Sequence, residues 1–270
     1  MRRIARLVSH IPPRGVCLVL GAGSGVGGNV AKVFAENGMT TALVRRDADK
    51  LRPLIDEIEA NGGRAEAFGG FDITKEEEVT ELVHRVETEL GPIEAVVYNI
   101  GAQTGPLPLE STEAWKFKRA WELGALGAFL VARAVAPLMA ERTRGTIIFT
   151  SSTAAFRGNK GQAAHAAAMG ARRLLAQSLC HELGPQGVHV VHVLLDGMVV
   201  SPGTLGKMWD RFSPDGSTWE ETVERKRAEE SIIEPRAVGE EYWRLHQQPR
   251  SSWTFEVDLR PWTDKAWFHA

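Results

Sequence analysis

The stretch Val16-Cys-Leu-Val-Leu-Gly-Ala-Gly-Ser-Gly-Val-Gly27 decides the fold of this chain. Residues 16–20 are apolar without interruption, which is typical of a parallel strand covered on both faces. A glycine-rich turn follows, and residues 26–37 then carry apolar side chains at helical spacing up to Gly38, a common helix stop. Glycine allows close approach to the main chain, so this pattern predicts that backbone N–H groups bind a pyrophosphate at the helix N-terminus. A glycine loop without a ligand is the alternative. The predicted phosphate-binding residues are Gly21, Gly23, Ser24, Gly25, Val26 and Gly27.

The rest of the chain alternates between strand and helix patterns. Strands are predicted at residues 16–20, 40–44, 65–68, 95–98, 146–150, 188–195 and 253–259. Helices are predicted at residues 26–37, 48–60, 74–90, 112–141, 161–183 and 236–247, and Thr74 is expected to form a capping box with Glu77. This alternation predicts an α/β fold with a single Rossmann-type doubly wound parallel sheet and helices on both faces.

One domain is predicted for residues 15–270, preceded by a basic arm at residues 1–14 that ends in Pro12-Pro13. An apolar run broken by Arg6 does not fit a secretory signal, and a flexible or surface-docked arm is favoured over organelle targeting. Residues 203–235 interrupt the alternation of strands and helices with turns and charged runs. This insertion either helps to close the ligand crevice as a substrate lobe or forms a solvated helical excursion.

Composition sets the broad class. A chain of 270 residues with 43% apolar and 24% charged residues can bury one large core. The net charge of −2 gives no general attraction to nucleic acid or membrane, and no uninterrupted apolar stretch approaches the ~20 residues of a membrane span. Cys17 and Cys180 both fall in apolar patterns, which favours a reducing, cytoplasmic location. The histidines show no metal-ligand spacing, so no metal is predicted.

Two arginines, Arg45 and Arg46, follow the second predicted strand, where a site selective for NAD places an acidic residue. A guanidinium instead suits the 2′-phosphate of NADP by charge and by bidentate geometry. The sequence therefore favours NADP over NAD, with a solvated charge pair of Arg46 and Asp47 as the alternative.

From residue 16 to residue 259 these features resemble the short-chain dehydrogenase/reductase family. Gly21, Gly25 and Gly27 match its cofactor loop, and the resemblance implies that Arg45 holds the 2′-phosphate. It also implies that Asp72 contacts the adenine edge and that Asn99 and Gly101 line the adenosine ribose. Ser152 corresponds to the serine that orients the substrate, and Gly197 and Ser201 lie in the segment expected around the nicotinamide.

Three of the four catalytic positions depart from the family pattern. The tyrosine and lysine of Tyr-x-x-x-Lys are His165 and Met169 here, and the asparagine is Gly124. His165 can serve as a proton donor near neutral pH or contribute only hydrogen bonds and packing. Arg172 and Arg173 follow Met169 by one helical turn, and either a compensating charge or a dimer contact is conceivable for them. Gly124 is expected to preserve the bend of its helix without the proton relay.

Two functions follow from this combination. The first is an NADP(H)-binding oxidoreductase that acts on a carbonyl or alcohol through Ser152 and His165, with weak or altered activity. The second is a catalytically silent nucleotide-binding protein with a regulatory or assembly role. A hydrolase or isomerase using Ser152 and His165 is a further alternative. The resemblance implies a small-molecule substrate and a homodimer or homotetramer formed through the two long helices.

Overall fold

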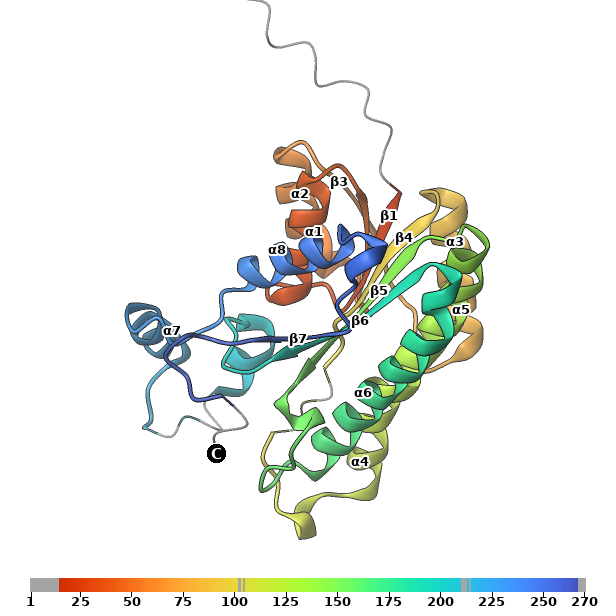
Figure 1. Ribbon diagram of the computed structural model, residues 1–270. Helices are drawn as coiled ribbons and strands as arrows, with labels where there is room; N and C mark the ends of the chain where they lie inside the picture. Colours follow the sequence, from red (N-terminus) through yellow and green to blue (C-terminus); the bar gives the residue numbers. More distant parts are fainter. Residues whose placement is uncertain (1–14, 102, 104, 210–212, 214, 267–270) are drawn as a thin grey trace, which may run out of the picture.

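The computed structural model describes residues 15–101, 103, 105–209, 213 and 215–266, so the predicted basic arm at residues 1–14 lies outside the described residues. Seven strands form one sheet of order β3-β2-β1-β4-β5-β6-β7, and every neighbouring pair is parallel (Figure 1). The strands are β1 (Val16–Leu20), β2 (Thr40–Val44), β3 (Arg64–Phe68), β4 (Ile93–Tyr98), β5 (Gly145–Ser152), β6 (Val188–Leu195) and β7 (Glu256–Leu259). The predicted doubly wound parallel sheet is confirmed.

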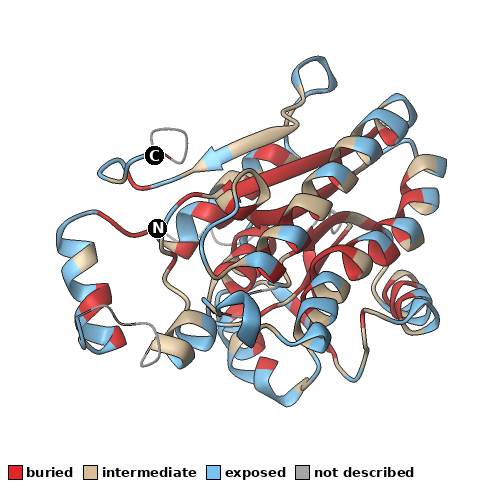
Figure 2. Ribbon diagram, turned by 90° about the horizontal axis from the view of Figure 1, so that it is seen from below, coloured by how far each residue is buried: buried red, intermediate tan, exposed pale blue. Residues whose placement is uncertain are grey.

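Helices cover both faces of this sheet. They are α1 (Val26–Glu36), α2 (Arg52–Ala60), α3 (Glu76–Glu89), α4 (Ala114–Trp121), α5 (Gly127–Glu141), α6 (Ala163–Leu183), α7 (Trp219–Ala228) and α8 (Pro235–His246). Figure 1 shows α1, α2 and α8 on one side of the sheet and α3, α5 and α6 on the other. The buried strands lie between these two layers (Figure 2).

The uninterrupted apolar strands follow from this three-layer arrangement. Successive side chains of a strand point to opposite faces. In β1, Leu18 and Leu20 accordingly join the core beneath α3, α5 and α6, whereas Cys17 and Val19 join the core beneath α1, α2 and α8. Both sets are fully buried, so a polar side chain at any of these positions would lose its contact with water.

The predicted long helix at residues 112–141 is divided in the structure. A π-turn (Glu122–Leu126) separates α4 from α5 and contains Gly124. Turns of this kind are a common cause of helix kinks. By length and composition the combined stretch Ala114–Glu141 would suffice to cross a membrane, although no spanning segment was predicted. Half of its most apolar 18-residue segment is buried inside the fold, as in the core helix of a globular domain.

Two local predictions differ from the structure. The capping box predicted at Thr74 is wrong, because the N-cap residue of α3 is Lys75 and the Thr74 hydroxyl donates to Asp72 instead. A capping box is present at Thr218, whose side chain accepts from the backbone N–H of Glu221 at the start of α7. The described part of the predicted insertion at residues 203–235 contains α7 and most of a second π-turn (Pro202–Gly206).

Candidate active site

The glycine loop lies between β1 and α1, beside the point where the strand order reverses from β1 to β4. Gly21 has a φ of +88°, a left-handed conformation that favours glycine. A Cβ at Gly27 would collide with the carbonyl oxygen of Gly21, so this turn closes only with glycine at position 27. The Asn99 side-chain amide donates to that same carbonyl at 3.2 Å. Asn99, directly after β4, thus holds the glycine loop by a hydrogen bond. A pyrophosphate would bind at this loop.

A second segment closes over the glycine loop. A Cβ built on Gly25 would lie 3.3 Å from the Cβ of Ser201, and one built on Gly203 would lie 3.1 Å from the Oγ of Ser24. The segment that follows β6 therefore touches the segment that follows β1. This contact places Ser201 beside the glycine loop.

Gly197 is covered by the C-terminal segment. A Cβ at this position would lie 2.8 Å from Cδ of Pro261 and 3.3 Å from a carboxylate oxygen of Asp264. Neither Pro261 nor Asp264 was predicted as a site residue. Nothing in the sequence pattern indicates that Pro261 and Asp264 lie near Gly197. They reach it only because the chain turns back toward Gly197 after β7.

Arg45 follows β2 and points back toward the glycine loop. One terminal guanidinium nitrogen lies 3.7 Å from the position that a Cβ of Gly23 would take. Arg46 is exposed to solvent. A cation therefore lies near the loop, on the side of the second strand, as the prediction of a 2′-phosphate site requires.

Asp72 lies after β3 and is engaged in a turn. Its carboxylate accepts from the Thr74 hydroxyl at 2.7 Å and from the Thr74 backbone N–H at 3.0 Å. These hydrogen bonds hold the pKa of Asp72 below its ordinary value, so the carboxylate is charged at neutral pH. Gly101 has open space around it, because no atom lies within 4 Å of a Cβ built there. Both residues are placed at the carboxyl ends of strands, where ligands of such sheets bind.

Ser152 and His165 meet across the end of β5. Ser152 is the last residue of β5 and His165 lies in the first turn of α6. The Ser152 Oγ is 3.1 Å from the His165 Nε2, and His165 is only 7% exposed. This distance is that of a hydrogen bond in either direction, so the histidine tautomer decides which group donates. The predicted pair of catalytic side chains is assembled in the structure.

The position of the family lysine carries no charge in this chain. Met169 is 2% exposed, and the Ser151 hydroxyl lies 3.8 Å from its sulfur. Arg172 is fully buried within the single chain, which contradicts the interpretation of Arg172 as a dimer contact. Arg173 instead forms a bidentate ion pair with Glu256 of β7, at 2.8 Å and 3.1 Å, and lies over the ring of Phe156.

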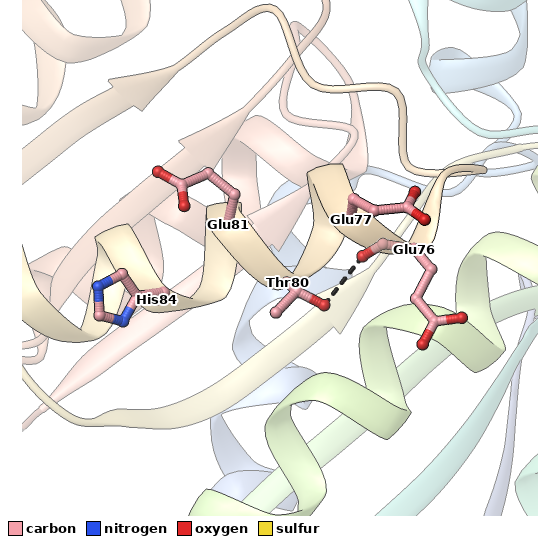
Figure 3. Close-up of a pocket in the computed structure, with 5 residues that line it drawn as sticks. All are labelled: Glu76, Glu77, Thr80, Glu81 and His84. Carbon is pink, nitrogen blue, oxygen red and sulfur yellow. Dashed lines mark hydrogen bonds between the residues drawn. The ribbon is translucent and has the colours of Figure 1, made fainter.

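One surface hollow lies away from these residues. It has a volume of about 490 Å³ and is lined by Glu76, Glu77, Thr80, Glu81 and His84. Figure 3 shows that all five residues come from α3, and none of them was predicted as a site residue. Among the described residues no three histidine, cysteine or acidic side chains are grouped closely enough to hold a metal. The hollow is therefore a solvated helix surface, distinct from the residues gathered at the carboxyl edge of the sheet.

Comparisons with known proteins agree with this geometry. The family model described as short chain dehydrogenase matches residues 15–204. A short chain dehydrogenase of Pseudocercospora fijiensis is 36% identical over 172 residues, which are 63% of this chain and 55% of that protein. A 7alpha-hydroxysteroid dehydrogenase of Escherichia coli is 32% identical over 177 residues, 65% of this chain and 68% of that protein. This chain therefore spans little more than half of the Pseudocercospora protein.

Solved structures are similar over nearly the whole chain. A short-chain dehydrogenase from Rhodopseudomonas palustris is 33% identical with a TM-score of 0.73, covering 92% of this chain and 99% of that one. A metagenomic short-chain oxidoreductase in complex with NADP is 26% identical with a TM-score of 0.74, covering 92% and 97%. The similarity extends through the carboxyl edge of the sheet, where the candidate residues lie.

Proposed function

Because this chain belongs to the short-chain dehydrogenase/reductase family, we propose that it binds NADP(H) and acts as an oxidoreductase on a small carbonyl or alcohol substrate. The observation that carries this proposal is the hydrogen-bonded contact of 3.1 Å between Ser152 and His165 at the sheet edge that holds the glycine loop. Two side chains able to hold and move a proton thus stand where the family places its serine and tyrosine. The NADP-bound metagenomic relative supports a nicotinamide cofactor for this fold.

The residues of the site fit such a cofactor. When bound, it would donate or accept a hydride at the substrate carbon. Gly21, Gly25 and Gly27 would hold its pyrophosphate through main-chain N–H groups, and Arg45 would pair with a 2′-phosphate. Asp72 and Asn99 would line the adenosine end. Gly197 and Ser201 would line the nicotinamide end, and the described parts of residues 203–235 would form one wall of the substrate space.

His165 would act as the proton donor during reduction. Ser152 would hydrogen-bond the substrate oxygen and hold it near the imidazole, and His165 Nε2 would deliver a proton as negative charge develops on that oxygen. An imidazolium is a competent acid near neutral pH, whereas the phenol of a tyrosine needs a neighbouring cation to ionise there. A histidine acid therefore does not require the lysine that Met169 replaces.

One observation favours a second candidate function, a catalytically silent nucleotide-binding protein with a regulatory or assembly role. Met169 is buried against Ser151, so its side chain offers no charge or hydrogen-bond donor to a ribose. Weak or absent turnover with intact cofactor binding is the behaviour expected of that protein.

We also propose that the chain forms a homodimer or homotetramer through α4, α5 and α6. Exposed apolar side chains lie along these helices: Trp115, Phe117, Trp121, Phe129 and Leu174. Apolar aromatic surface of this kind is typical of subunit interfaces. The two cysteines are free thiols, and with them we propose a cytoplasmic location.

Titration of the protein with NADPH and with NADH, followed by fluorescence, tests the cofactor. A signal with neither coenzyme would exclude both functions. A panel of aldehydes and ketones with the bound coenzyme then separates the two, because measurable turnover supports the oxidoreductase and its absence supports the silent protein. The triple variant Gly124→Asn, His165→Tyr and Met169→Lys should raise the rate if only the proton chemistry has diverged, whereas no gain would show that the substrate space differs as well.

A further inference from the structure

Arg172 is the largest fully buried side chain of the described residues. It lies on α6 on the same helical face as His165 and Met169, seven and three positions further along. Each of these three side chains is buried. The guanidinium therefore lies inside the protein, one helical turn beyond the position of the family lysine.

Three main-chain carbonyl groups surround this guanidinium. Its Nε donates to the carbonyl oxygen of Gly124 at 2.7 Å, and its terminal nitrogens donate to those of Thr150 at 2.5 Å and Ile100 at 2.7 Å. Its carbon lies 4.9 Å from the centre of the Tyr98 ring. The three carbonyls belong to the π-turn between α4 and α5, the end of β5 two residues before Ser152, and the turn after β4. Arg172 thus joins three segments, one of which, β5, ends at Ser152.

The charge of Arg172 has no carboxylate partner among the ion pairs of the described residues. Burial lowers its pKa to about 10, which leaves the group protonated at neutral pH. Carbonyl dipoles and the face of an aromatic ring offset part of the cost of burying this cation, but they carry no net charge. A net positive charge therefore remains fixed inside the protein, one helical turn beyond Met169.

We propose that Arg172 is a positioning residue whose fixed positive charge, one helical turn beyond Met169, makes the site prefer the reduced coenzyme. The inference rests on the proposed function. The oxidised nicotinamide ring carries a positive charge and the reduced ring is neutral, whereas both coenzymes carry the same phosphates. In the family the lysine at the position of Met169 holds the nicotinamide ribose, so a cation one helical turn beyond Met169 would repel an oxidised ring bound there. Such repulsion would weaken NADP⁺ binding without weakening NADPH binding. At that separation, in a partly desolvated site, the expected difference is roughly tenfold in affinity.

Equilibrium titration of the wild-type protein with NADPH and with NADP⁺ gives the first test. NADPH should bind roughly tenfold more tightly. In Arg172→Met the ratio of the two dissociation constants should fall toward one, even if loosening of the three segments weakens both coenzymes. A purely structural role of Arg172 would weaken both equally and leave the ratio unchanged.

Arg173→Met is the matched control. Arg173 is the adjacent arginine of α6, but the carboxylate of Glu256 neutralises it, so its removal should leave the NADPH to NADP⁺ ratio at the wild-type value. The double variant Met169→Lys with Arg172→Met returns a cation to the neighbouring turn and should restore the preference for NADPH.

Failure of this inference differs from failure of the proposed function. If neither coenzyme binds the wild-type protein, the proposed function is wrong. If both bind the wild-type protein equally well, the inference about Arg172 is wrong, and this outcome does not depend on whether any variant folds. A folded Arg172→Met protein that keeps the wild-type ratio, or an equal change in Arg173→Met, would overturn it as well.

Discussion

The Tyr98 hydroxyl occupies the space that a side chain at Gly127 would need. It donates a 2.5 Å hydrogen bond to the carbonyl oxygen of Leu123 in the π-turn, and a Cβ built on Gly127 would collide with it and with the side chain of Ile73. Tyr98 is fully buried at the end of β4, so it cannot move aside into solvent. The Tyr98 hydroxyl therefore requires a glycine at position 127, the first residue of α5.

Gly127→Ala should destabilise the protein by about 1–3 kcal/mol, because overpacking of a closed core site forces neighbours to shift. Urea unfolding followed by circular dichroism measures this. Gly170→Ala is the control, since the nearest atom to a Cβ there is 4.0 Å away and alanine should stabilise α6 by about 0.5–1 kcal/mol. Equal stabilities of Gly127→Ala and wild type would contradict the placement of the Tyr98 hydroxyl.

Arg45→Asp should reverse the coenzyme preference. The guanidinium near Gly23 favours a 2′-phosphate, and a carboxylate in its place repels the phosphate and accepts from a 2′-hydroxyl. We expect NADPH binding to weaken by about 10- to 100-fold, or about 1.4–2.7 kcal/mol, while NADH binding is kept or improved. Fluorescence titration measures both. Arg52→Ala removes an exposed arginine paired with Asp56 and should change neither affinity.

If the protein turns over a carbonyl substrate, His165→Ala should lower kcat by about 10²- to 10⁴-fold, because it removes the proton donor. NADPH affinity should stay within about twofold of wild type, since the coenzyme is held by the glycine loop. Steady-state kinetics and titration give both numbers. His181→Ala, an exposed histidine near the other end of α6, is the control. An unchanged kcat in His165→Ala would show that another group supplies the proton.

His192 should make stability depend on pH. Burial lowers its pKa to about 4, an effect that the nearby Glu256 carboxylate only partly offsets, whereas an unfolded histidine titrates near 6.5. The folded state therefore favours the neutral imidazole. The resulting stability is fully present above about pH 6.5 and is lost as the pH falls toward 4, up to about 3 kcal/mol.

Urea unfolding at pH 7, 6 and 5 tests this dependence. His192→Gln should lose less stability than wild type between pH 7 and pH 5, whereas His84→Gln, which changes an exposed histidine, should follow the wild-type curve. Parallel curves for wild type and His192→Gln would show that His192 is not buried as a neutral ring.

Most of the fold follows from local patterns in the sequence. The strands at residues 16–20, 40–44 and 188–195 have the predicted bounds, because each is a continuous run buried on both faces. The capping box at Thr74 was wrong because a short-range competitor, the carboxylate of Asp72, takes the Thr74 hydroxyl. Propensity rules rank such residues by type and do not decide between two hydrogen-bonding partners within reach, here the Asp72 carboxylate and the backbone N–H groups at the start of α3.

The sequence predicts which residues share the site where these residues directly follow a strand. Parallel strands bring their carboxyl ends to one edge, so the meeting of Ser152 and His165 follows from topology and helix phase. The burial of Arg172 did not follow, because an arginine in a helix is usually exposed and its three acceptors come from distant segments. The signal available in the sequence was the helical spacing of Arg172 from His165 and Met169, which places all three residues on the buried face of α6.

The packing of α8 against α1 has a consequence for biosynthesis. Phe34 meets the ring of Trp243 edge-on at 5.3 Å, and Glu36 pairs with Arg236 on the same seam. A nascent chain that has released only the first half of the protein from the ribosome therefore leaves this face of α1 uncovered. Chaperones that bind apolar segments have a target there until α8 has emerged from the ribosome and can dock on α1.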